Sequence, residues 1–121
     1  MDILTAEEKL AAWVEKIIEM PGKVYRTALL AKLREGFEVK LVSGVPAGLS
    51  RVNEFTVEIK GFALEKSVLW THFQKIFEAL PLEQKEGFLY VDVSGKVLFG
   101  MSEKEGLRLS TATLDLTASF V

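Results

Sequence analysis

Residues 111–120 read Thr-Ala-Thr-Leu-Asp-Leu-Thr-Ala-Ser-Phe, in which polar and apolar side chains alternate without a break. Because successive side chains of a β-strand point to opposite faces, this period of two predicts a strand with one apolar and one hydroxyl-rich face. Such strands are typical of antiparallel sheets with one packed face. Leu107 and Leu109 are out of phase with the pattern, so we expect either a β-bulge near Ser110 or an apolar patch on the hydroxyl-rich face.

Two segments repeat apolar residues at helical spacing. The first covers about residues 5–20, and Thr5-Ala6-Glu7-Glu8 at its start matches a capping box. Pro21-Gly22 ends it. The second covers residues 63–80 and ends at Pro81, because the residue before a proline is disfavoured in a helix.

Shorter alternating segments predict four further strands. They lie at residues 37–41, 54–60, 88–93 and 96–101, with a long hairpin loop between the first two and a tight Ser94-Gly95 turn between the last two. Val24 and Tyr25 fit a short extended piece, and residues 27–35 fit one or two helical turns. We therefore predict one α+β domain over residues 1–121, with two helices packed on one face of a mostly antiparallel sheet of about four to five strands.

Composition excludes several classes of protein and site. The chain has 15 Lys and Arg against 17 Asp and Glu, without the basic excess of nucleic-acid binders. It has no cysteine, which excludes disulfides, thiolate zinc sites and cysteine nucleophiles. No segment approaches 18 apolar residues, so we expect no membrane span. Residues 1–8 do not resemble a signal peptide, so we expect a cytoplasmic protein.

Candidate catalytic residues are few. His72 is the only histidine, and Val68 and Ile76 occupy the positions four residues away, where a helical carboxylate partner would lie. Two carboxylate pairs, Asp92 with Asp115 and Glu54 with Glu58, would suit acid–base chemistry or magnesium, although carboxylates on strands usually face solvent. The glycine-rich loop at residues 44–48 lacks the Gly-Lys-Ser/Thr of a phosphate-binding loop. We expect no catalytic, cofactor or metal site.

The tip of the first hairpin is the candidate interaction site, because its apolar residues belong to no predicted core pattern. The residues that we expect to form an interface between subunits are Val45, Pro46, Leu49, Arg51 and Asn53.

Three features resemble one group of proteins: the helix that ends in Met20-Pro21-Gly22-Lys23-Val24-Tyr25, the hairpin strand Phe55-Thr56-Val57-Glu58-Ile59 that leads into the second helix, and the closing strand at residues 112–120. Together they resemble the tail terminator and neck proteins of long-tailed phages and prophages, a group that includes minor capsid and head–tail joining proteins. The resemblance implies a ring, usually a hexamer, that ends the tail tube and meets the head connector. It also implies assembly in the host cytoplasm and a final place in the virion.

The main alternative is a small α+β module that binds a protein or a small ligand for regulation. Such a module would be a monomer or a dimer with a concave apolar pocket. An enzyme would need a cleft that joins His72 to a carboxylate of another strand.

Overall fold

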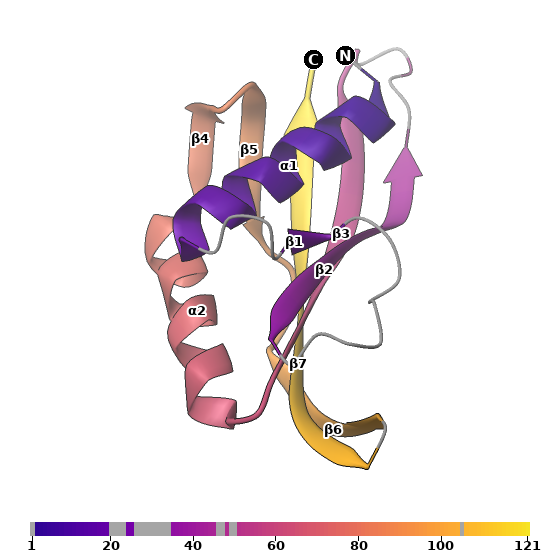
Figure 1. The fold of residues 1–121 in the computed structure, drawn as a ribbon. Coiled ribbons are helices and arrows are strands. Elements are labelled where there is room, and N and C mark those ends of the chain that lie inside the picture. Colours follow the sequence, from indigo (N-terminus) through magenta and orange to yellow (C-terminus); the bar gives the residue numbers. More distant parts are fainter. Residues whose placement is uncertain (1, 20–23, 26–34, 46–47, 49–50, 105) are drawn as a thin grey trace.

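The computed structural model describes residues 2–19, 24–25, 35–45, 48, 51–104 and 106–121 (Figure 1). Its helices are α1 (Ile3–Ile18) and α2 (Lys66–Ala79). Its strands are β1 (Val24–Tyr25), β2 (Gly36–Val45), β3 (Asn53–Ala63), β4 (Leu82–Lys85), β5 (Phe88–Val93), β6 (Leu98–Lys104) and β7 (Leu107–Phe120). The expected helical turns at residues 27–35 lie outside the described residues, except for Glu35.

The seven strands of the described residues join one sheet, in the order β1-β2-β3-β7-β5-β4, with β6 paired to β7 beside this path. The expected four to five strands were too few, because β4 was missed and β1 was expected only as an extended piece. β1 pairs with β2 in parallel, and every other pair is antiparallel. The α+β class with a mostly antiparallel sheet is confirmed.

The arrangement of β5 and β6 corrects the expected meander of three strands. The two strands do not pair with each other but lie end to end along the same side of β7. β6 pairs with the first half of β7, from Leu107 to Thr113, and β5 pairs with the second half, from Leu116 to Ser119. β7 is 14 residues long, so one strand has room for both partners. Ser94-Gly95 is therefore a link between two partners of β7 rather than a tight hairpin turn.

The first helix begins earlier than expected and has a different cap. Asp2 is the N-cap residue, and its Oδ1 accepts a hydrogen bond of 2.8 Å from the backbone N–H of Thr5. The expected capping box of Thr5 and Glu8 is therefore wrong, because α1 already includes both residues. The second helix ends at Ala79, close to the expected end before Pro81.

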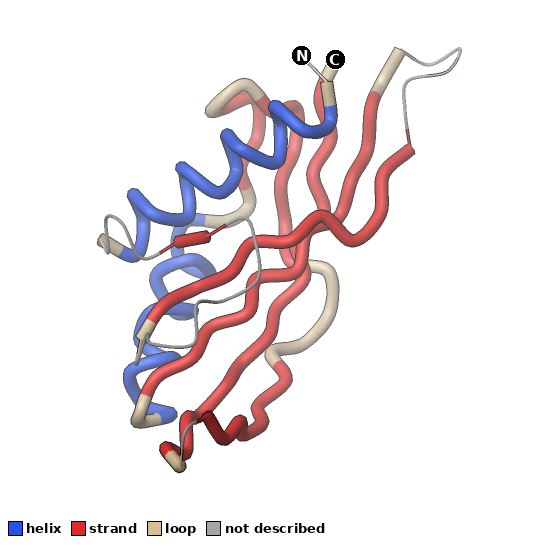
Figure 2. The backbone as a smooth tube through the Cα atoms, turned by 45° about the vertical axis from the view of Figure 1, so that its right-hand side comes forward, coloured by secondary structure: helices blue, strands red, loops and turns tan. Residues whose placement is uncertain are grey.

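One hydrophobic cluster joins both helices to the sheet. α1 contacts β1, β2 and β3, and α2 contacts α1, β3 and β7. Figures 1 and 2 show α1 crossing the strands, with its start at the same end of the sheet as the end of β7. The largest completely buried side chains of the cluster are Phe37, Phe55, Phe73, Phe120, Leu10, Ile18, Ile59, Leu69, Ile76, Leu114, Leu116 and Val14.

The alternation in β7 is confirmed, because its apolar residues from Ala112 to Phe120 are buried and the polar residues between them are not. The register of β7 with β6 runs through Ser110 without a shift, and its register with β3 is regular up to Ser110, which excludes a bulge there. Leu109 therefore shares the hydroxyl-rich face with Thr111. It is nevertheless buried, as is Phe62 opposite Thr111, so this end of the face is apolar but covered. No described helix is both long and apolar enough to cross a membrane.

Candidate functional site

The described interface candidates gather at one end of the β2–β3 hairpin. Val45 ends β2 opposite Glu54, and its side chain is 64% exposed. Asn53 begins β3 opposite Phe120. Arg51 is exposed and has a φ of 58°, and its backbone N–H donates to the Gly48 carbonyl at 3.1 Å. Pro46 and Leu49 lie outside the described residues.

Exposed apolar side chains surround this hairpin end. Val42 is the extra residue where the register of β2 and β3 shifts between Leu41 and Ser43, and its side chain is 55% exposed. Such a bulge turns a side chain away from the regular alternation. Leu4 in the first turn of α1 is also exposed, and a side chain on Gly44 would touch Ile3 of the same turn. Val45 faces the hydroxyl-rich side of the sheet, whereas the first turn of α1 meets Gly44 on the core side. We call Leu4, Val42 and Val45, on the two sides of this hairpin end, the hairpin-end patch.

A second exposed apolar surface lies where β6 meets α2. Met101 is 68% exposed, and Leu98 and Phe99 of the same strand are also exposed. The Phe99 ring lies 6.0 Å from the ring of Trp70, between ring centroids, and the Lys66 ammonium lies 5.4 Å from the Phe99 centroid. Leu98 faces the other side of the sheet, since it pairs with Thr113 whereas Phe99 pairs with Ala112. We call Leu98, Phe99, Met101 and Trp70, on the two sides of β6, the β6 patch. The sequence already placed Trp70 off the apolar stripe of its helix. It did not indicate that Phe99 would pack against Trp70.

The hydroxyl-rich face of the sheet carries the predicted carboxylates. Asp92 and Asp115 lie on neighbouring strands, β5 and β7, as expected. They are not directly opposite each other, because Asp92 pairs with Thr117 and Asp115 pairs with Glu58. Asp92 Oδ2 accepts a hydrogen bond of 2.9 Å from the Tyr90 hydroxyl, which raises the pKa of Tyr90. Glu54 and Glu58 do share this face with Thr56, whose hydroxyl lies 3.3 Å from that of Thr117.

His72 has a carboxylate partner that the helical spacing could not reveal. Its Nε2 lies 3.3 Å from Glu35 Oε1, just before β2, and its ring meets Phe37 edge-on at 5.5 Å between centroids. His72 Nδ1 is buried and has no hydrogen-bond partner among the described residues. The long chain separation between His72 and Glu35 explains why sequence reasoning missed this pair.

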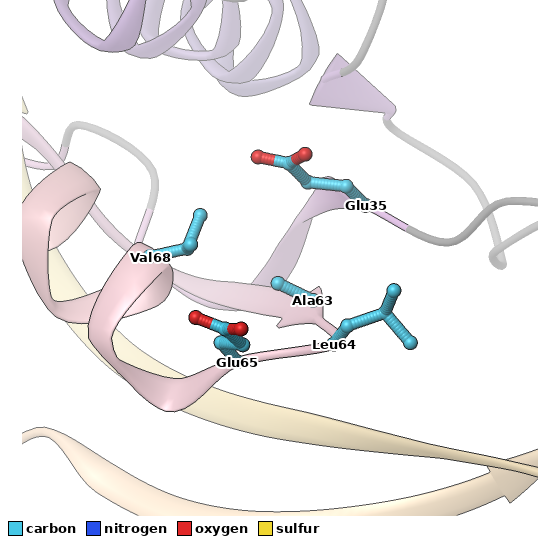
Figure 3. Close-up of a pocket in the computed structure, with 5 residues that line it drawn as sticks. All are labelled: Glu35, Ala63, Leu64, Glu65 and Val68. Carbon is cyan, nitrogen blue, oxygen red and sulfur yellow. The ribbon is translucent and has the colours of Figure 1, made fainter.

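A pocket of about 350 Å³ lies next to this pair and is lined by Glu35, Ala63, Leu64, Glu65 and Val68. Figure 3 shows Glu35 on the chain that leads into β2, and Glu65 and Val68 at the start of α2. Three of its lining residues are apolar, and Glu35 and Glu65 contribute carboxylates. Among the described residues, no group of three or more His, Cys, Asp or Glu side chains could hold a metal ion.

The chain was also compared with known proteins. No protein-family model matches it, and no curated protein matches it in sequence.

Proposed function

We propose that this chain is a non-enzymatic structural protein of a phage or prophage tail or neck. In this proposal it forms a ring that terminates the tail tube and joins it to the head connector. The observation that supports the proposal best is the presence of two exposed apolar surfaces, the hairpin-end patch and the β6 patch, on different strands of one small sheet. Exposed apolar surfaces of this kind mark interaction sites. Two unlike surfaces suit head-to-tail contacts, which close into rings.

The proposal also gives a role to the hydroxyl-rich face. Both helices add side chains to the same core cluster, and we take them to cover the same face of the sheet. The other face, with Thr56, Glu58, Asp115 and Thr117, then remains for the tail tube or the head connector. Assembly would take place in the host cytoplasm, without a cofactor and without reading a nucleic-acid sequence.

Molar mass in solution tests the proposal, measured by light scattering from micromolar to near-millimolar protein. We expect a closed multimer near six times 13.5 kDa, seen as rings in electron micrographs. A mass that grows without limit would indicate filaments and contradict a closed ring. A monomer at every concentration would contradict self-assembly in solution.

A small binding or regulatory module is the second candidate, and the pocket between Glu35 and α2 favours it. Its volume of about 350 Å³ falls in the range of small-molecule sites. This candidate predicts a monomer or a dimer whose NMR signals near Glu35, Leu64 and Val68 shift when a ligand binds. The same light-scattering series therefore separates the two candidates.

A further inference from the structure

We propose that β6 of one copy adds, antiparallel, to residues 40–45 of β2 in the next copy, so that the sheet continues from subunit to subunit. This inference rests on the proposed self-assembly and names the two surfaces that carry it. In this inference, a second copy of this chain covers each of the two edges.

Within the part of the chain that the structure describes, each of the two strands has an edge of matching length that pairs with no other strand. Among the described residues, β6 pairs with β7 alone, and β1 covers β2 only at Phe37 and Glu38. Residues 40–45 and 98–103 therefore each present a row of backbone donors and acceptors that the described sheet does not use. Such an edge is a template for a strand from another chain.

One register matches the side chains on both faces. If Leu98 lies opposite Val45, Phe99 lies opposite Gly44, and Met101 meets the bulge at Leu41 and Val42. Leu98 and Val45 both belong to the hydroxyl-rich face, since their present partners are Thr113 and Glu54. Opposite residues of antiparallel strands must point to the same side of the sheet, and this register satisfies that condition.

The core side of the joint brings apolar side chains together. Phe99 and Gly44 share this side, since their partners are Ala112 and Phe55. Gly44 has no side chain, and a Cβ atom there would lie 3.0 Å from Ile3 Cδ1. Ile3 therefore already fills the space over Gly44, and the Phe99 ring of the next copy would pack against the Ile3 side chain at this sheet edge. This contact would also bring Met101 and Trp70 toward the exposed Leu4.

Charge complementarity supports the same register. Asp2 caps α1 next to Ile3, and Lys66 lies over the Phe99 ring, so the Phe99–Gly44 contact brings an ammonium toward a carboxylate. Opposite charges on the two sides favour this docking over pairing of like edges, because like charges in contact oppose association.

A head-to-tail joint also covers more of the apolar surface than a symmetric one. If β6 paired with β6 of a second copy, Val42 and Val45 would remain exposed. A joint between β6 and β2 covers both patches with one kind of contact, and repetition of an unlike contact generates a ring when the rotation closes.

Cysteine cross-linking tests the joint directly, because the natural chain has no cysteine. Val45→Cys and Leu98→Cys are combined in one chain, and the protein is treated at assembling concentration with oxidant or with a short bis-maleimide. We expect a ladder of covalent multimers on a denaturing gel, ending at the ring size. Both positions are exposed, so the fold should be retained, as circular dichroism can confirm.

Four control variants define the result. Each single variant should stay monomeric on the gel, because a head-to-tail joint does not bring a residue close to the same residue of the neighbouring subunit. The pair Val45→Cys with Leu89→Cys uses an exposed residue of β5 outside the joint and should give no ladder. Dimers from Met101→Cys or Leu98→Cys alone would instead indicate pairing of β6 with β6 and would overturn the proposal.

Light scattering on the same samples distinguishes failure of the β6–β2 joint from failure of the proposed ring. A ring without a ladder would overturn the β6–β2 joint and leave the proposed function intact. A monomer without a ladder would overturn both.

Discussion

Gly61 in β3 lies where a side chain has no room. A Cβ atom there would be 2.7 Å from Phe37 Cε1 and 2.9 Å from Leu69 Cδ2, both of which belong to the buried core. Real Cβ atoms do not approach so closely, so the side chains of Phe37 and Leu69 would have to shift within the packed core. We expect Gly61→Ala to lower the free energy of unfolding by about 1–3 kcal/mol, the usual cost of overpacking, measured by urea denaturation.

Gly48 provides the matched control for this residue. A Cβ atom at Gly48 has no neighbour within 4 Å, so Gly48→Ala should change the free energy of unfolding by less than about 0.5 kcal/mol. If the two variants lost equal stability, the close packing around Gly61 could not be the cause.

The cap of α1 gives a prediction at the scale of one element. The N–H of Thr5 donates to the Asp2 carboxylate and lowers its pKa below the ordinary value of 3.8. A lowered pKa in the folded state stabilises the fold above pH 3.8, and the stabilisation is lost as the pH falls through the folded value. Asp2→Ala should therefore unfold at lower urea than the natural chain at pH 7, and the difference should shrink near pH 3.

Asp2→Asn is the control, because asparagine caps helices well but does not titrate. We expect it to keep most of the stability at pH 7 and to lose the pH dependence that Asp2 contributes. If Asp2→Ala matched the natural chain at pH 7, the cap would contribute nothing and the start of α1 would need another explanation.

At the same scale, the sequence predicted the elements better than their partners. Local periodicity was enough to place α1, α2, the β2–β3 hairpin and the alternating faces of β7, because burial on one side dictates that periodicity. It could not show that β5 and β6 both pair with β7, since Ser94-Gly95 fits a hairpin turn equally well. The contacts of His72 with Glu35 and of Trp70 with Phe99 depend on the tertiary arrangement and have no local signal.

The two tryptophans allow assembly of the whole molecule to be followed without a label. Trp13 is buried in the core, whereas Trp70 is 43% exposed and touches Phe99 of the β6 patch. If the β6 patch is covered by a second copy, the indole of Trp70 leaves water as the ring forms. In a Trp13→Phe variant, we therefore expect the emission maximum to move to shorter wavelength, and acrylamide quenching to weaken, over the concentration range where the molar mass rises.

The Trp70→Phe variant, which retains only Trp13, is the control for the Trp13→Phe variant. Its emission should stay constant over the same range, because Trp13 is 5% exposed in a single copy and has little water to lose. The two variants must also assemble alike in light scattering, so that a difference in fluorescence reports the position of the indole rather than a lost ring. Assembly with no change at Trp70 would place the contact between subunits away from α2 and β6, and would leave the exposed aromatic cluster for a partner other than this chain.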